Sequence, residues 1–178
     1  MASNVETYLE RFASQVVSDA KKLLKKAKGN TALSETIRFK IDSTATGFDT
    51  KFYMDDYGTY LDEGVSGNKK TQYFEDYKGK KKISQYAYTT KGPPIDILSK
   101  WVKKKGLKPK GWGKGRDKKT GQYISGLAIY ISNKIKTRGI PSISFFQIPL
   151  GIGLKKLDEN FLKEVTLDIK RYLTTYTK

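Results

Sequence analysis

The sequence predicts an α+β fold: a single domain over residues 1–178, in which long N- and C-terminal helices and a middle helix pack an antiparallel sheet. Three observations predict this class. Long segments near both ends repeat apolar residues every three or four positions, which is the period of an amphipathic helix. Two shorter segments alternate apolar and polar residues, as half-buried strands do. A lysine-rich region, residues 65–119, separates these strands from the last third of the chain.

Residues 4–28 are the first predicted helix. Asn4 is the candidate N-cap, acidic residues come early, lysines come late, and Gly29 follows the last turn. The apolar face of this helix contains Val5, Leu9, Phe12, Val16, Ala20, Leu23 and Ala27.

A β-hairpin is predicted after the first helix. Apolar and polar residues alternate in residues 34–42 and again in residues 47–56, and a short Ser/Thr/Gly segment connects the two runs. This arrangement favours two antiparallel strands. The next segment, YGTYLDEGVSG at residues 57–67, is expected to be the end of the second strand.

The basic region is predicted to be a long exposed excursion. Residues 65–119 contain 17 lysines and arginines and four acids, and so contribute +13 of the net charge of +17. A short helix is expected at about residues 94–105, with Ile97, Leu98, Trp101 and Val102 facing inward and Gly106 after its end. The flanking loops are polar and rich in glycine, so we expect this region to become ordered only on assembly.

The last third of the chain predicts two further helices. Residues 122–139 carry a helical apolar stripe that ends at Gly139. Residues 140–150 are expected to be extended and interrupted by Pro149. A long helix closes the chain, and its apolar stripe contains Leu154, Leu157, Phe161, Val165, Ile169 and Leu173.

The composition excludes several kinds of chemistry. The chain has no histidine and no cysteine, which excludes Ser–His and Cys–His nucleophiles, disulfides and the usual zinc sites. Adjacent strand residues point to opposite faces, so the acidic pairs Asp55–Asp56, Asp62–Glu63 and Asp158–Glu159 are expected to be solvated edge charges. The sequence therefore predicts no catalytic residue, no metal site, no cofactor and no enzymatic activity.

The sequence also lacks features of membrane and secreted proteins. No apolar run approaches the roughly 20 residues that span a bilayer, and the polar N-terminus does not resemble a signal peptide. We therefore expect no membrane partner and a cytoplasmic site of synthesis.

Lysines next to aromatic rings suggest contact with DNA or with an acidic protein surface. Arg116 is the only arginine among the 17 cations, which disfavours recognition of specific bases. Non-specific DNA contact and ordering against an acidic protein neighbour both remain open. The candidate contact residues are Lys69, Lys70, Lys80, Lys81, Lys82, Lys103, Lys104, Lys105, Lys108, Lys110, Trp112, Lys114, Arg116, Lys118 and Lys119.

Three segments in this order resemble a known family. YGTYLDEGVSG follows a hairpin, ILSKWVKKKGL forms a short helix, and LAIYISNKIKTRGIPSISFF leads into a terminal helix. Together they resemble the neck or tail-completion proteins of tailed bacteriophages, which are head–tail connector subunits. The long lysine-rich region is larger and more basic than this resemblance implies.

The resemblance implies a structural virion protein. It would form a homo-oligomeric ring between portal and tail, contact portal, adaptor or tail-tube proteins, surround the DNA channel, and assemble in the host cytoplasm. The implied subunit-interface candidates are Tyr57, Gly58, Tyr60, Asp62, Glu63, Gly64, Arg138, Phe145 and Phe146. Packing of the two tyrosines within their own subunit is the alternative, and a free non-specific DNA-binding protein is the alternative function.

Overall fold

The computed structural model describes residues 3–29, 32–44, 47–107, 111, 113–116, 121 and 123–176, and it confirms the α+β class. The chain divides into two compact units. Unit 1 comprises the residues up to Asp62, Phe74–Lys82 and the residues from Ile143 onward, and unit 2 comprises Glu63–Tyr73 and Ile83–Ser142. The predicted excursion at residues 65–119 therefore falls largely within unit 2.

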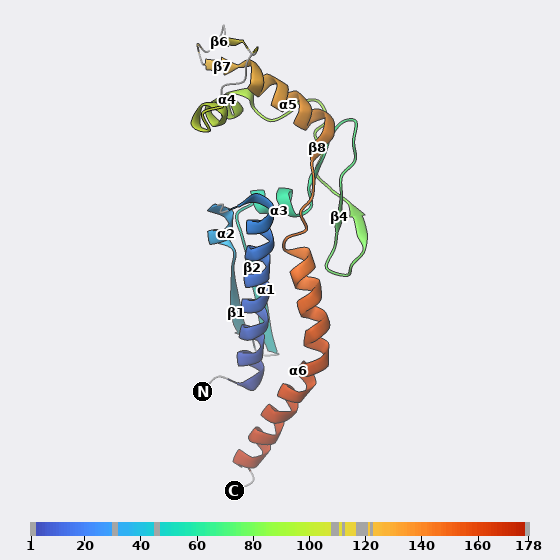
Figure 1. The fold of residues 1–178 in the computed structure, drawn as a ribbon. Helices are drawn as coiled ribbons and strands as arrows, with labels where there is room; N and C mark the ends of the chain where they lie inside the picture. Colours follow the sequence, from blue (N-terminus) through green and yellow to red (C-terminus); the bar gives the residue numbers. More distant parts are fainter. Residues whose placement is uncertain are drawn as a thin grey trace. The chain divides into compact units, whose positions relative to one another are not determined.

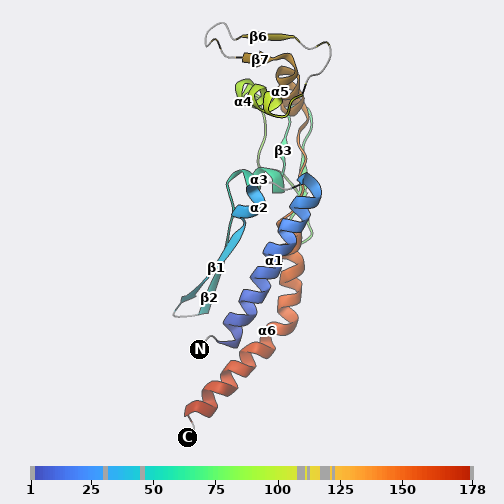
Figure 2. The ribbon, with the colours of Figure 1, turned by 60° about the vertical axis from the view of Figure 1, so that its left-hand side comes forward.

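Two long helices form the frame of unit 1. α1 (Asn4–Lys28) has the predicted bounds, and α6 (Gln147–Tyr176) runs beside it (Figures 1 and 2). The prediction of Asn4 as N-cap is wrong: Ser3 caps the helix, and its Oγ accepts a hydrogen bond from the Glu6 N–H at 3.0 Å. The backbone N–H of Asn4 instead donates to Oδ1 of Asp168 on α6, at 2.9 Å.

The predicted hairpin is confirmed, but residues 34–36, expected at the start of its first strand, are helical instead. β1 (Arg38–Thr44) pairs with β2 (Gly47–Tyr53) in antiparallel register, and a short helix α2 (Ala32–Thr36) precedes it. Phe39 and Phe52 are register partners and pack on the core.

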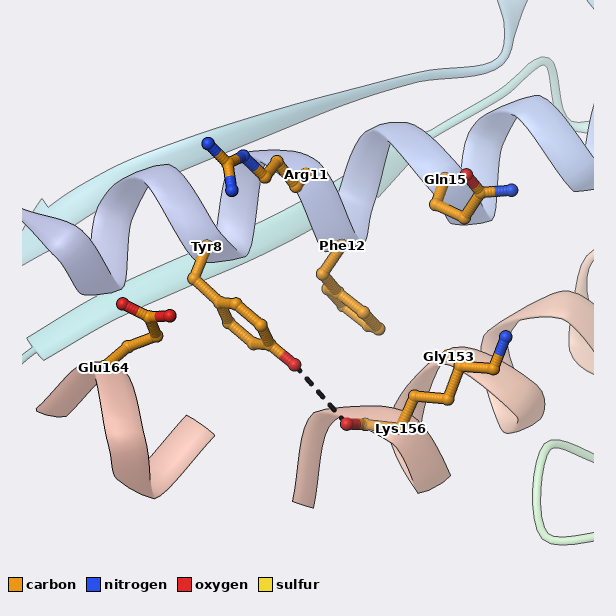
Figure 3. A pocket seen from close by; sticks show the side chains of 7 residues that line it. All are labelled: Tyr8, Arg11, Phe12, Gln15, Gly153, Lys156 and Glu164. Carbon is orange, nitrogen blue, oxygen red and sulfur yellow. Dashed lines mark hydrogen bonds between the residues drawn. The ribbon is translucent and has the colours of Figure 1, made fainter. Parts of the chain in front are cut away.

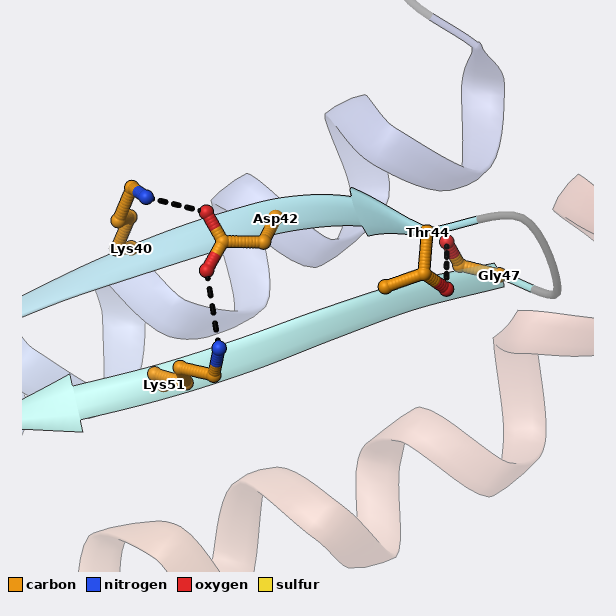
Figure 4. Close-up of polar contacts among 5 residues, drawn as sticks. All are labelled: Lys40, Asp42, Thr44, Gly47 and Lys51. Carbon is orange, nitrogen blue, oxygen red and sulfur yellow. Dashed lines mark hydrogen bonds and ion pairs between the residues drawn. The ribbon is translucent and has the colours of Figure 1, made fainter.

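The polar side of the hairpin carries a surface ion-pair group (Figure 4). Asp42 lies between the ammonium groups of Lys40 and Lys51, and the Lys51 Nζ–Asp42 Oδ2 distance is 3.1 Å. Hydrogen bonds from Lys40 and Lys51 lower the pKa of Asp42. The Thr44 hydroxyl donates to the carbonyl of Gly47 at 3.0 Å, at the end of the hairpin.

The core of unit 1 is made of apolar side chains from α1, α2, the hairpin and the start of α6. Phe52 and Phe146 pack edge to face with ring centroids 5.3 Å apart. The buried members of this cluster are Val16, Val17, Ala20, Leu24, Leu33, Ile37, Phe145 and Phe146.

The start of α6 differs from the predicted extended run. The helix begins at Gln147, so Pro149 lies in its first turn, where a backbone N–H has no helical partner and proline is tolerated. At Gly153 an added Cβ would lie 2.8 Å from the ring of Phe12 and 2.9 Å from Val16. Gly153 therefore allows α6 to approach α1 closely.

Unit 2 contains two helices that pack together, α4 (Ile95–Lys104) and α5 (Gly126–Arg138). The predicted short helix at about 94–105 is confirmed. Gly106 has φ +64°, and the N–H groups of Gly106 and Leu107 donate to the carbonyls of Lys103 and Val102, which is a Schellman cap. α5 starts later than predicted because the residues before it belong to a strand.

Short strands complete the fold. β3 (Val65–Ser66) pairs with β8 (Gly139–Ile140), and β6 (Lys114–Arg116) pairs with β7 (Tyr123–Ser125), in both cases antiparallel within unit 2. β4 (Tyr73–Glu75) pairs with β5 (Lys81–Ile83) where the chain passes between the two units. The described residues thus form four two-stranded sheets, of which the sequence predicted only β1–β2, because strands of two or three residues have no detectable period.

Candidate interaction surfaces

The segment after the hairpin is a helix, so the prediction of a strand end is wrong. α3 (Tyr57–Asp62) is supported by hydrogen bonds from the N–H groups of Gly58 and Thr59 to the carbonyls of Asp55 and Asp56. Gly58 is buried, and a Cβ added to it would lie 2.6 Å from the sulfur of Met54.

Asp62 ends α3 and is buried, with 2% of its surface exposed. Its Oδ1 accepts a hydrogen bond from the N–H of Phe146 at 2.8 Å, and its carbonyl accepts one from the N–H of Ser144 at 3.0 Å. The prediction that Asp62 is a solvated edge charge is therefore wrong. Its carboxylate lies at the start of α6, where it compensates the helix dipole and holds α3 against that helix.

Two glycines of the family-like motifs, Gly64 and Gly139, have an intramolecular role in unit 2. Gly64 has φ +77° and Gly139 has φ +75°, which residues with a side chain rarely adopt. A Cβ on Gly64 would lie 2.7 Å from the N atom of Ser142, and one on Gly139 would collide with the carbonyl of Val65. Both glycines thus allow the backbones around β3 and β8 to approach.

The aromatic interface candidates divide into two groups. Phe145 and Phe146 lie in the core of unit 1, where their side chains are covered by this chain. Tyr57 and Tyr60 on α3 are 41% and 43% exposed. Partial burial, with the Asp55 carboxylate nearby, raises the pKa of Tyr57. An interface role for these two tyrosines stays a prediction.

The charged interface candidates lie near the surface of unit 2. The side chain of Arg138 is exposed, and its carbonyl accepts a hydrogen bond from Nε2 of Gln72 at 2.7 Å. Glu63 is half-buried and is the first residue of unit 2.

Lys80, Lys81 and Lys82 are exposed on the β4–β5 hairpin, which Asp76 organises. Oδ1 of Asp76 accepts hydrogen bonds from the backbone N–H groups of Lys80 and Lys78, at 2.8 and 2.9 Å, and its Oδ2 lies 3.0 Å from Lys82 Nζ. The hydrogen bond from the Lys80 backbone is the main cause of a lowered pKa of Asp76. This carboxylate, which the sequence analysis did not single out, holds the lysines in place.

A second group of candidate lysines lies in unit 2. Lys69 and Lys70 are exposed, and the Lys69 N–H donates to the carbonyl of Thr137 on α5. Lys103, Lys104 and Lys105 are exposed at the end of α4. The predicted contact residues therefore belong to separate units.

Five further predicted contact residues, and the side chains of two more, lie outside the part of the chain that the structure describes. Lys108, Lys110, Trp112, Lys118 and Lys119 lie outside the described residues. For Lys114 and Arg116 the structure describes the backbone alone, in β6.

Part of the predicted apolar stripe of α6, Ile169 and Leu173, is exposed, and Leu162 adds to this exposed face from outside the predicted stripe. Asp168 accepts hydrogen bonds from the N–H groups of Asn4 and Val5, so α1 begins beside it and the last turns of α6 extend past α1 (Figures 1 and 2). Leu162 is 71% exposed and Ile169 is 55% exposed. The exposed large apolar residues of α6 are Ile152, Leu162, Leu167, Ile169 and Leu173.

A groove of about 400 Å³ lies between α1 and α6 in unit 1 (Figure 3). The Tyr8 hydroxyl donates across it to the carbonyl of Lys156 at 3.4 Å. Arg11 and Lys156 bring positive charge, and Glu164 brings negative charge. This open groove thus has a mixed lining and does not single out a ligand of one charge.

A metal site and a membrane-spanning helix are two further features that could indicate a function. Within the described ranges, acidic side chains form no group of three or more that could hold a metal ion. The same residues contain no helix that is both long and apolar enough to cross a membrane.

Comparison with known proteins gave no match. No protein-family model matches the chain, and neither a curated protein nor a solved structure is significantly similar to it.

Proposed function

We propose that this protein is a structural subunit of a tailed-phage virion that forms a ring at the head–tail connection. In this role it is a neck or tail-completion protein that docks between portal and tail around the DNA channel. Its mechanism is assembly, in which no bond is made or broken. The chain assembles in the host cytoplasm and remains in the virion.

The observation that carries this proposal is the exposed apolar face of α6. Leu162 and Ile169 are seven residues apart, so they lie on the same side of the helix. Monomeric proteins rarely leave several large aliphatic side chains exposed together, and such faces mark surfaces that another protein covers. The order of the three family-like segments in the sequence supports a connector as the type of protein.

Ring closure requires contacts between unlike surfaces. A head-to-tail contact pairs the α6 face of one copy with a different surface of the next copy, and repetition of that contact closes a ring. The exposed tyrosines Tyr57 and Tyr60 on α3 are candidates for this second surface, because tyrosine combines apolar area with a polar end.

The first test is the mass of the full chain by light scattering, at about 50 mM and about 500 mM salt, with and without a short DNA duplex. We expect a discrete oligomer, on the order of six or twelve copies, that persists at high salt without DNA. A monomer that binds duplex at low salt and releases it at high salt contradicts the proposal. In that case an added portal ring must recruit the chain for the proposal to survive.

Two α6 variants locate the contact. The double variant Leu162→Ser, Ile169→Ser should lower the mass to that of a monomer, because it removes two exposed aliphatic groups and leaves the core unchanged. Leu167→Ser is the matched control, since Leu167 is also half-exposed on α6 but lies roughly 140° around the helix from Leu162. Equal effects of both variants would rule out a specific α6 face.

A non-specific DNA-binding function is the second candidate. The exposed lysines at positions 69, 70 and 103–105 favour it, because lysine neutralises phosphates without reading bases. This function predicts a steep loss of affinity with salt and no requirement for the α6 face.

A further inference from the structure

The helix α4 has one packed side and one exposed side. Ser99 and Val102 are buried, with 1% and 3% of their surfaces exposed. Oγ of Ser99 accepts a hydrogen bond from the N–H of Ser125, just before α5, at 3.2 Å. The packing against α5 therefore sets which residues of α4 face outward.

The exposed side combines apolar and basic groups. Ile97 is 59% exposed and Trp101, one turn later, is 44% exposed, so the prediction that these two residues face inward is wrong; Val102 is the residue that packs. Lys100 and Lys104 are exposed at three and seven positions after Ile97, so these four residues share one face. We call Ile97, Lys100, Trp101 and Lys104 the α4 face.

The apolar half of the α4 face argues against DNA as its ligand. Phosphate contacts need cations, and the bases of a duplex are stacked inside it, so an exposed isoleucine would remain uncovered on duplex DNA. A partner that covers Ile97 and Trp101 must itself offer apolar side chains.

The charge of the α4 face restricts the partner further. The two lysines on this face favour carboxylates around the apolar contact. A second copy of this chain has 35 lysines and arginines against 18 acids, so its surface does not complement the α4 face. A bilayer is also a poor match, because helices that lie on membranes bury a longer apolar face than these two side chains provide.

We propose that the α4 face is a docking site for an acidic amphipathic segment of a different protein. Apolar side chains of that segment cover Ile97 and Trp101, and carboxylates beside them pair with Lys100 and Lys104. This is helix-type recognition through side chains at i, i+3, i+4 and i+7. It goes beyond ring formation, since it requires neither α6 nor a second copy.

The probe is a fluorescently labelled peptide of about 18 residues with leucines at i, i+3, i+4 and i+7 and glutamates at most other positions. Its anisotropy is measured with the full chain at about 150 mM salt, which screens long-range attraction. A peptide of the same composition in scrambled order is the control for net charge. We expect the ordered peptide to bind at least about tenfold more tightly than the scrambled one.

Two variants separate the apolar and the basic halves of the site. Ile97→Ser with Trp101→Ser keeps the charge, and Lys100→Gln with Lys104→Gln keeps the apolar pair. Each should weaken binding of the ordered peptide about tenfold or more. Lys155→Gln with Lys163→Gln on α6 is the matched control for charge and should leave binding within about twofold.

Several results would overturn the inference. These are equal affinity for ordered and scrambled peptides, or full affinity in the serine variant. Binding to duplex DNA, or to vesicles of phosphatidylcholine and phosphatidylserine, with no binding to the peptide, would assign the α4 face to that ligand instead. Circular dichroism checks that the serine variant is folded, and the glutamine variant tests the site if it is not.

Binding of the ordered peptide to the α4 face does not depend on whether the chain forms a ring. The α6 variant Leu162→Ser, Ile169→Ser should bind the ordered peptide like the wild type, because these side chains belong to unit 1. A chain that binds the ordered peptide, stays monomeric and is not recruited by an added portal ring would refute ring formation and leave the docking site supported. A ring that does not bind the ordered peptide would support ring formation and refute the docking site.

Discussion

Unit 1 and unit 2 bury different kinds of side chains. The core of unit 1 contains large apolar groups such as Leu24, Leu33 and Phe145. Among the described residues of unit 2 the buried apolar ones are small, namely Val65, Val102 and Ala128, and the buried polar ones are Ser66, Gln72, Ser84, Ser99, Ser125 and Ser132.

The buried polar groups of unit 2 connect its segments through hydrogen bonds. Ser84 Oγ donates to the carbonyl of Gly64 at 2.6 Å, and Ser132 Oγ donates to the carbonyl of Pro93 at 2.8 Å. A buried hydrogen bond contributes about 1 kcal/mol net, whereas burial of a large apolar side chain contributes about 1.5–3 kcal/mol. Unit 2 should therefore open locally more often than unit 1.

The two units bring their segments close together by two means, apolar side chains and glycines. Unit 1 fills the space between its helices with rings and aliphatic groups, and uses Gly153 where α1 and α6 approach. Unit 2 uses glycine where backbones contact directly, at Gly64 and Gly139, and unit 1 does the same at Gly151, where an added Cβ would collide with the Tyr77 carbonyl. A small, highly charged region can form a defined structure in this way with little apolar burial.

The largest expected effect is a cavity in unit 1. Phe145→Ala should lower the free energy of unfolding by about 3–5 kcal/mol, because the ring is fully buried and its removal leaves an unfilled space. Denaturant unfolding followed by circular dichroism measures this change. Tyr60→Ala removes an exposed ring from the same unit and should change stability by less than about 0.5 kcal/mol. Comparable losses in both variants would contradict the assignment of the core.

The next effect is a steric one in unit 2. Gly139→Ala should cost about 1–3 kcal/mol, because the residue has φ +75° and its new methyl group would meet the Val65 carbonyl. Amide hydrogen exchange should become faster in α5 and leave α1 slow, since the change is confined to unit 2.

Gly113→Ala is the matched control in unit 2. An added Cβ there has no atom within 4 Å, so exchange should be unchanged. If Gly139→Ala accelerated amide exchange equally in α1 and α5, the two units would unfold together. That result would contradict the expectation that unit 2 opens more often than unit 1.

The smallest effect concerns Asp168, which accepts hydrogen bonds from the first two N–H groups of α1, next to the Ser3 cap. Burial alone would raise the pKa of Asp168, but hydrogen bonds from the N–H groups of Val5 and Asn4 outweigh it, and the pKa lies below its ordinary value. Asp168→Ala should cost about 1 kcal/mol at neutral pH, as the loss of a helix cap does.

The sign of the pH dependence follows from the lowered pKa. The contribution of Asp168 is fully present above its unfolded pKa of about 3.9 and is lost as the pH falls through the folded value. Urea midpoints of wild type and variant should therefore differ at neutral pH and converge below about pH 4. Lys163→Ala, an exposed change on the same helix, should show no such convergence; a constant gap for Asp168→Ala would disprove the cap.

Periodic segments were predictable from the sequence. The helix over residues 4–28 and the short helix ending before Gly106 have the expected positions, and the hairpin forms with its first strand starting at Arg38 rather than at residue 34. Each carries several apolar residues at a regular spacing, and each ends at a recognisable turn or cap. Residues 57–62 lacked such a pattern, and tyrosine and glycine suggested a strand end where a helix forms.

The candidate surfaces were only partly predictable. The lysine clusters were visible as composition, but their division between the two units was not. Phe145 and Phe146 stood out as aromatic residues in a short run, and only packing with Phe52 places them in a core. The exposure of Ile169 depends on where α1 begins, which no property of residue 169 indicates.

By itself, the sequence determined the α+β class, the ends of α1, the net charge of +17 and the lack of histidine and cysteine chemistry. These properties are local or compositional, so no distant contact can change them. Tertiary structure alone decided that Asp62 is buried beside Phe146, that Gly64 and Gly139 allow backbone contact, and that α4 and α6 expose apolar faces. The reason is physical: whether a side chain is covered depends on segments far away in the chain, and spacing along one segment does not record them.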